Sequence, residues 1–299
     1  MFILESERLR AEIAEPGENP NTGFRFGRAA FIADITLDGE RHFGANEPKN
    51  LIHPSSGGRG LCCEYTADLS GEAAVGEYFP KLGVGLIRKE EEEPYCFHKR
   101  YRDVREYPVS IEKGRDWARF VTEPVSCMGY AVREERKISV SGNRLTMEVI
   151  LENTGEKPIL TGEYCHNFLS IDGMAITPDY HLDLPGLPEL GVRDIPNLYP
   201  SPCNFHADGD GIEILRSETA VSLAEIPLCG LDSKKQPFSW RLSHKGAKAA
   251  VSVEEYLVPS KITLWETDHI FSAEMEHTIS LAPGENKSWK RVYTFENLA

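Results

Sequence analysis

The chain has 299 residues, of which 40% are hydrophobic and 9% aromatic, as in ordinary globular proteins. Its 33 Lys and Arg against 47 Asp and Glu give a net charge of −14, which argues against a nucleic-acid partner because binding to phosphates relies on Lys and Arg. No window approaches the roughly 20 apolar residues of a membrane helix. The N-terminal segment, with Glu5, Glu7 and Arg8, lacks the apolar region of a secretory signal. We therefore expect a cytoplasmic enzyme or binding protein that does not associate with membranes.

Strand-like segments follow one another along the chain. Runs rich in β-branched and aromatic residues occupy 30–37, 137–140, 144–151, 249–257 and 288–295. Turn sequences that favour positive φ separate several of them, at 37–40 (LDGE), 140–143 (VSGN) and 152–155 (ENTG). Helical periodicity is nearly absent, and 19 Pro and 25 Gly are spread over the whole chain. The pattern predicts a mainly β fold.

The sequence favours one domain over two. A β-sandwich commonly spans more than 200 residues as one unit. The Pro-rich segment 178–204 carries apolar residues that would pack it on the body, namely Leu182, Leu184, Leu187, Leu190 and Ile195. The acidic run 90–93 is most simply an exposed hairpin tip. We expect residues 1–299 to form a single domain.

The seven cysteines predict neither a disulfide framework nor a structural zinc site. Their number is odd, they lack C-x-x-C spacing, and the adjacent Cys62 and Cys63 are poorly placed to bridge each other. We expect reduced thiols that act as small apolar core residues.

Motifs for covalent and nucleotide chemistry are missing from the sequence. There is no G-x-S-x-G, no Walker loop and no G-x-G-x-x-G that opens a helix. Lys81–Gly85 (KLGVG) superficially resembles a glycine-rich loop but lacks the following helix and a Lys-Ser/Thr pair. Acid–base chemistry by histidine and carboxylates remains.

Two segments carry such groups. His166 lies in a strand-like run, 163–171 (EYCHNFLSI), before the turn at Asp172-Gly173, where a lone histidine is more often structural. If the segment around 271–281 is extended, Glu274 and Glu276 share one face, which by itself is typical of a solvent-facing strand.

Eight further features follow one another in order along the chain, namely 24–32 (FRFGRAAFI), 36–39 (TLDG), 79–85 (FPKLGVG), 151–155 (LENTG), 164–172 (YCHNFLSID), 273–274 (AE), 281–285 (LAPGE) and Trp289. In this combination the chain resembles the aldose 1-epimerase, or galactose mutarotase-like, superfamily. The resemblance runs from about residue 25 to 295, and no single motif in it is diagnostic.

This resemblance implies a single large antiparallel β-sandwich with a sugar cleft and no cofactor or metal. In such enzymes a histidine donates a proton to the ring oxygen of an aldose while a glutamate removes the proton of the anomeric hydroxyl. His166 matches the acid, and Glu274, seven residues before Leu281, matches the base. The family's early histidine-and-glycine segments have no literal counterpart, and Lys81–Gly85 occupies their place.

Four further residues are candidates for binding the sugar, each with a structural alternative. Arg25 could instead pair at the surface, Lys81 could cap a strand end, and His98 could be an exposed edge residue. Trp265 could stack on a sugar or belong to the core. Asp172 more simply fixes a turn with Gly173.

The resulting hypothesis is a mutarotase that interconverts the anomers of a small neutral monosaccharide. The acidic chain and the lack of an arginine pair near Lys81 argue against a 6-phosphate substrate and against lyase action on anionic polysaccharides. A carbohydrate-binding protein without catalysis on the same fold is the alternative. The sequence identifies neither the sugar nor the oligomeric state.

Overall fold

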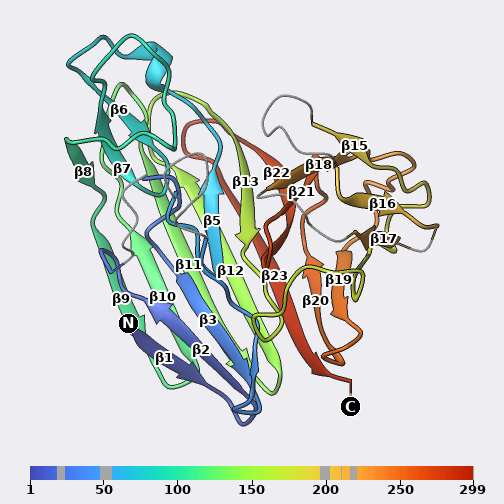
Figure 1. Cartoon of the computed structure of the whole chain (residues 1–299). Coiled ribbons are helices and arrows are strands. Elements are labelled where there is room, and N and C mark those ends of the chain that lie inside the picture. The colour runs from blue at the N-terminus through green and yellow to red at the C-terminus, as the bar shows by residue number, and fades with distance from the viewer. Residues whose placement is uncertain (19–23, 48–55, 196–202, 210, 216–220, 299) are drawn as a thin grey trace.

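The computed structural model describes residues 1–18, 24–47, 56–195, 203–209, 211–215 and 221–298. In these residues the chain forms two large antiparallel sheets that lie face to face and a small third sheet (Figure 1). The sequence prediction of a mainly β, antiparallel sandwich is confirmed. The described part holds one short 3₁₀ turn, at Ser70–Glu72, and no helix long and apolar enough to cross a membrane.

The first sheet carries the candidate site. In the described residues its strands are, in order across the sheet, β1 (Phe2–Glu5), β2 (Leu9–Ala14), β3 (Phe31–Leu37), β5 (Leu61–Tyr65), β13 (Ile159–Asn167), β22 (Phe271–Leu281), β21 (Lys261–Glu266), β18 (Ser222–Ile226) and β15 (Arg193–Asp194), with β4 (Arg41–His42) paired to β3. Segments far apart in sequence therefore meet at its centre, where β13 lies between β5 and β22.

The second sheet backs the first. Its described strands run in the order β16 (Phe205–Ala207), β17 (Gly211–Ile214), β14 (Tyr180–Asp183), β19 (Phe238–His244), β20 (Ala249–Glu255), β23 (Asn286–Asn297), β12 (Arg144–Asn153), β11 (Val132–Ser141), β10 (Trp117–Thr122) and β9 (Val109–Lys113). The small sheet comprises β6 (Tyr78–Lys81), β7 (Gly85–Arg88) and β8 (Val104–Glu106).

The hairpins follow the predicted turn chemistry. The β3–β4 turn holds Asp38 and Gly39 at φ of 53° and 74°, and the β11–β12 turn holds Gly142 at 56°. Asp and Gly tolerate this left-handed conformation better than β-branched residues do. The turns thereby fix the register in which each strand buries one face.

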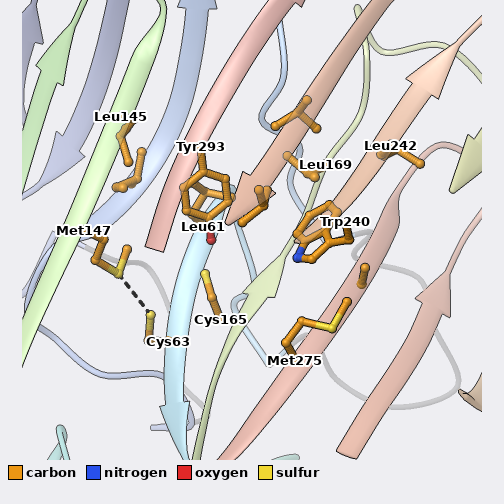
Figure 2. Packing of buried hydrophobic residues seen from close by; sticks show 14 of the residues in the cluster. Leu61, Cys63, Leu145, Met147, Cys165, Leu169, Trp240, Leu242, Met275 and Tyr293 are labelled. Atoms are coloured by element: carbon orange, nitrogen blue, oxygen red, sulfur yellow. Dashed lines mark hydrogen bonds between the residues drawn. The ribbon is translucent and has the colours of Figure 1, made fainter. Parts of the chain in front are cut away.

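Alternating side chains from both large sheets fill the space between them. On β12, Leu145 and Met147 are buried, and they meet Leu61, Cys63 and Cys165 of the first sheet in one apolar cluster (Figure 2). The Sγ atom of Cys63 lies 3.6 Å from Sδ of Met147. Each fully buried Leu or Met side chain stabilises the fold by about 1.5–3 kcal/mol, so this cluster holds the sheets together.

A buried ion pair also joins the two sheets. Arg291 of β23 donates to both carboxylate oxygens of Glu163 on β13, at 2.9 and 2.6 Å. Its Nε lies 2.7 Å from Glu255, and all three side chains are at most 2% exposed. Because unpaired charges are costly in the interior, this arrangement ties β13 to the second sheet in one position.

The exposure of individual residues tests several smaller predictions. Leu182, Leu184 and Leu187 are buried, whereas the segment 196–202 lies outside the described residues. Residues 90–93 are exposed, as predicted. All seven cysteines are free, but the expected core position is wrong for Cys96 and Cys229, which are exposed because they belong to loops and not to buried strand faces.

Candidate active site

His166 and Glu274 lie on the face of the first sheet that points away from the second. On β13, Cys165 belongs to the core, so its neighbour His166 faces outward. On β22, Ala273 and Met275 belong to the core, and Glu274 takes the opposite face, as the sequence pattern predicts. The two residues thus reach the same side of the sheet from adjacent strands.

The pairing of β13 with β22 is interrupted where these two side chains lie. Regular pairs run from Ile159 and Leu281 to Glu163 and His277, and pairing returns as an isolated bridge between Leu169 and Phe271. The same register places His166 opposite Glu274, inside the interruption. Direct cross-strand neighbours have Cβ atoms about 4.5–5.5 Å apart, so their side chains can share a hydrogen bond.

Asn167 bridges this interruption with its side chain. Its Nδ2 donates to the carbonyl oxygens of Ala273, at 2.6 Å, and Cys165, at 3.1 Å. Its backbone N–H donates to Oγ of Ser272 at 3.1 Å, and its Oδ1 accepts from the hydroxyl of Tyr293 at 2.9 Å. These bonds satisfy polar groups that a regular ladder would have paired.

The histidine and the glutamate contact each other directly. Nε2 of His166 lies 3.0 Å from Oε1 of Glu274, and their side chains are 3% and 13% exposed. The imidazole stacks on Phe168 with ring centres 3.8 Å apart. The rings of Phe26 and Trp265 stand nearly perpendicular to it, with ring centres 5.8 and 5.2 Å from its own. The aromatic side chains lock the ring in one orientation and keep water from it.

Burial moves the proton affinities of the pair in opposite senses. Desolvation raises the pKa of Glu274 to about 7; the positive charge of Arg25 opposes the rise, and the negative charge of Glu64 adds to it. Desolvation, followed by the charge of Arg25, lowers the pKa of His166 well below its usual value. Burial thus leaves Glu274 close to its midpoint at neutral pH and favours the neutral form of His166.

The free nitrogen of the imidazole indicates its tautomer. Nδ1 of His166 is buried and has no hydrogen-bond partner in the described residues. A buried N–H without a partner is costlier than a buried lone pair on aromatic surroundings, so in the neutral ring the hydrogen belongs on Nε2. His166 then donates toward Glu274 and toward any oxygen that takes that place.

A second polar cluster forms one wall beside this pair. Nε of Arg25 donates to Glu64 at 2.6 Å, and another of its nitrogens donates to the hydroxyl of Tyr164 at 2.6 Å. Lys81 donates to the other oxygen of Glu64 at 3.0 Å. Glu64 and Tyr164 are paired across β5 and β13, next to the position of His166.

Backbone contacts hold the segment that carries Arg25. Phe24 has a φ of 50°, and its carbonyl accepts from the hydroxyl of Tyr95 at 3.1 Å. Gly27 donates to the carbonyl of Cys63 at 2.8 Å, which ties the segment to β5. The guanidinium of Arg25 also lies 4.2 Å from the ring centre of Phe97, a cation–π contact.

A pocket opens beside the pair. The described residues that line it are Arg25, Glu47, Phe97, His98, His166, Leu223, Trp265 and Glu274. The structure thus brings five of the residues singled out from the sequence to one pocket. It combines a hydrogen-bond donor, a carboxylate, a guanidinium and an aromatic wall, a set that suits a small polyhydroxylated molecule.

Lys81 lies elsewhere than expected for a sugar contact. It is 2% exposed and is absent from the described pocket lining. Its ammonium donates to Glu64 and, at 2.6 Å, to the carbonyl oxygen of Tyr65. Asp172 also stays outside, as expected, since it accepts from the backbone of His42 at 2.9 Å and has a φ of 54° next to Gly173.

Sequence reasoning missed Glu47, Glu64, Phe97, Tyr164 and Leu223. Glu64 belongs to a short buried strand, LCCEY, in which all five residues are buried. A single Glu in such a run is a signal for a paired buried charge, because an isolated carboxylate is too costly there. Its partners could not be read from the sequence, since Lys81, Arg25 and Tyr164 are 17 to 100 residues away.

Comparison with solved structures places the fold. A candidate aldose 1-epimerase from Escherichia coli K12 is similar over 99% of this chain and 99% of its own, with a TM-score of 0.63 and 13% sequence identity. A galactose mutarotase related enzyme from Lactobacillus acidophilus is similar over 100% and 98%, with a TM-score of 0.61 and 13% identity. This chain has the galactose mutarotase-like fold.

A further solved structure is similar in fold, whereas the comparisons of sequence find no match. A galactose 1-epimerase from Lactobacillus acidophilus NCFM has a TM-score of 0.54 at 13% identity and covers 99% of this chain and 94% of its own. No protein-family model and no curated protein matches the sequence. At 13% identity these comparisons show the fold alone, so activity has to be argued from the site itself.

Proposed function

We propose that this protein is an aldose 1-epimerase that interconverts the α and β anomers of a small neutral monosaccharide. The observation that carries the proposal is the contact of 3.0 Å between His166 and Glu274 at the wall of a pocket. Mutarotation needs a proton donor at the ring oxygen and an acceptor at the anomeric hydroxyl. Both oxygens are bonded to the same carbon, so a donor and an acceptor one hydrogen bond apart can serve both.

The reaction balances with these two groups alone. Glu274 takes the proton of the anomeric hydroxyl, the bond between C1 and the ring oxygen breaks, and the ring oxygen takes a proton from His166. The free aldehyde rotates about its C1–C2 bond. On closure the hydroxyl proton returns to His166 and Glu274 gives its proton to the new anomeric oxygen, which restores the pair. Positioned acid–base groups of this kind are worth about 10²–10⁴ in rate.

The pair must hold one mobile proton to act in this way. The pKa of Glu274, raised to about 7 by burial, keeps that proton on the pair at and below neutral pH. In the resting pair this proton is on the carboxyl of Glu274, because burial lowers the pKa of His166 well below its usual value and favours the neutral imidazole. The reactive form is the carboxylate with the imidazolium, as acceptor and donor respectively.

The charges around the pocket support a neutral substrate. Arg25 and Lys81, the two cations of the polar cluster beside the pair, are both bonded to Glu64. Arg25 retains hydrogen-bond donors for a sugar hydroxyl, since a guanidinium has five. Trp265 and Phe97 offer apolar surfaces for the C–H groups of a sugar ring.

Polarimetry tests the function directly. Freshly dissolved α-anomers of common aldoses should reach equilibrium faster with the protein than without it, in proportion to protein concentration. Thermal shift with the same sugars provides the parallel binding measurement. Stabilisation by a sugar with no acceleration of its mutarotation would support a non-catalytic sugar-binding protein and reject the enzyme.

A further inference from the structure

The guanidinium of Arg25 is bonded to the carboxylate of Glu64, while the carboxylate of Glu274 lines the same pocket as Arg25. Arg25 and Glu274 line the same pocket, and the charge of Arg25 acts on Glu274. Yet in the described residues no ion pair within 4.0 Å joins them, whereas Arg25 lies 2.6 Å from Glu64. Arg25 also donates to the hydroxyl of Tyr164 at 2.6 Å and to Oγ of Ser56 at 3.4 Å, so Glu64 is its only charged partner among these contacts in the described residues.

The surroundings of Glu64 favour its binding to a cation. Its carboxylate accepts from Arg25 at 2.6 Å, from the hydroxyl of Tyr164 at 2.5 Å and from Lys81 at 3.0 Å. Burial alone would raise the pKa of Glu64, but the charges of Lys81 and Arg25 outweigh it and lower that pKa to about 2. The side chain is 8% exposed, so these charge-assisted bonds act with little screening.

We propose that Glu64 is a positioning residue of this site: it anchors Arg25 on the wall formed by β5 and β13 and so prevents an ion pair between Arg25 and Glu274. Such an ion pair would place a guanidinium across the pocket and occupy the carboxylate that has to receive the anomeric proton. The catalytic consequence rests on the proposed mutarotase function. The anchoring itself is a property of the protein without substrate.

Other charged groups near Glu274 do not replace this anchor. His166 faces it from β13, and Lys261 of β21 acts on it from the other neighbouring strand. Glu47 and His98 line the same pocket from loops. Among the described residues, Arg25 lowers the pKa of Glu274 more than Lys261 does, second only to the opposing effect of desolvation, so a change in the position of Arg25 should alter that pKa.

Titration of Glu274 tests the anchor without any substrate. Protein labelled with ¹³C at the side-chain carboxyls of glutamate gives a signal for Glu274, assigned by its loss in Glu274→Gln. In the wild type its midpoint should lie near 7. In Glu64→Gln it should fall by about one pH unit or more, a tenfold loss of proton affinity, because Arg25 is then free to pair with Glu274.

A double-variant cycle separates anchoring from the loss of one negative charge. In an Arg25→Met background, Glu64→Gln should move the Glu274 midpoint less than half as far as it does with Arg25 present, because there is then no guanidinium that can move to Glu274. Glu64→Asp, which keeps the charge, should stay near the wild type. If Glu64→Gln leaves the midpoint unchanged, or moves it equally in both backgrounds, the proposal is wrong.

A second variant keeps the test valid if Glu64→Gln alone fails to fold. Glu64→Gln strands the buried ammonium of Lys81, so Glu64→Gln/Lys81→Met removes both charges and should retain a wild-type circular dichroism spectrum while showing the lowered midpoint. Kinetics then separate the two proposals. A wild type that accelerates no aldose but shows the predicted cycle would reject the mutarotase function alone, whereas an active enzyme without the cycle would reject the role of Glu64 alone.

Discussion

The hydroxyl of Tyr293 donates to Oδ1 of Asn167 at 2.9 Å, and this bond links the second sheet to the point where β13 and β22 lose their regular pairing. Tyr293 is fully buried, as is Asn167. The carboxamide thus takes over part of the ladder that would otherwise join the strands of His166 and Glu274. Local geometry at the site depends on a side chain that faces the core.

Replacing this carboxamide should destabilise the fold. In Asn167→Ala the Tyr293 hydroxyl and the carbonyl of Ala273 lose their partners in the interior, at a cost of about 3 kcal/mol in the free energy of unfolding. Urea unfolding of the variant and the wild type measures this difference in the free energy of unfolding. Tyr293→Phe, which removes one bond and leaves the rest of the Asn167 side chain paired, should cost about 1 kcal/mol. A change below 1 kcal/mol in Asn167→Ala would show that the bridge is not needed.

The catalytic efficiency should depend on pH through the shared proton. Because burial raises the pKa of Glu274 to about 7, the pair loses its mobile proton above that pH. We expect kcat/KM to be level below about 7 and then to fall tenfold per pH unit. Polarimetry in a series of buffers, with the spontaneous rate subtracted, measures it. A kcat/KM that rises through pH 7 would mean that the deprotonated pair is the active form.

Stability should follow the same titration with a definite sign. The folded pKa of Glu274 lies above its ordinary value of 4.5, so the folded protein binds the extra proton between about 4.5 and 7, and the contribution of Glu274 to stability declines as the pH rises through this window. Glu274→Gln should therefore be more stable than the wild type at pH 8, by about 1–3 kcal/mol. The difference should vanish near pH 4. Equal stability at both pH values would contradict a buried, desolvated carboxylate.

Neutral aldoses should react better than their 6-phosphates. Arg25 and Lys81 already share the carboxylate of Glu64, and Glu47 and Glu274 add negative charge to the pocket. A phosphate would meet this arrangement without a free cation among the described pocket residues. Polarimetric rates with glucose and glucose 6-phosphate, side by side at equal ionic strength, decide the point. A clear preference for the phosphate would reject this interpretation of the pocket.

The sequence predicts the fold more fully than the site. Period-two burial and Asp-Gly or Ser-Gly-Asn turns are local signals, so the strands around 31–37 and 144–153 and their hairpins follow from the residues themselves. The shared face of Glu274 and Glu276 follows in the same way. That His166 meets Glu274 was expected only through a family resemblance, because the two are far apart in sequence.

The remaining parts of the site lack a local signal. Glu64 and Lys81 lie on strands of two different sheets. Nothing in the segment KLGVG distinguishes a buried lysine of an ion pair from a lysine that reaches a ligand. Asn167 looks like an ordinary polar residue after a histidine. Its role depends on where β22 and β23 pass, which tertiary packing alone decides.

Near-isosteric replacement of His166 and Glu274 is the most direct test of the central claim, that these two groups move the protons of an aldose. His166→Asn and Glu274→Gln should each lower kcat/KM for mutarotation by about 10²–10⁴ with the fold retained by circular dichroism. Glu276→Gln is the matched control, because it removes a carboxylate from the same face of β22, outside the described pocket lining, and should remain close to the wild type. Full activity in either of the first two variants, or loss of activity in Glu276→Gln alone, would contradict the account.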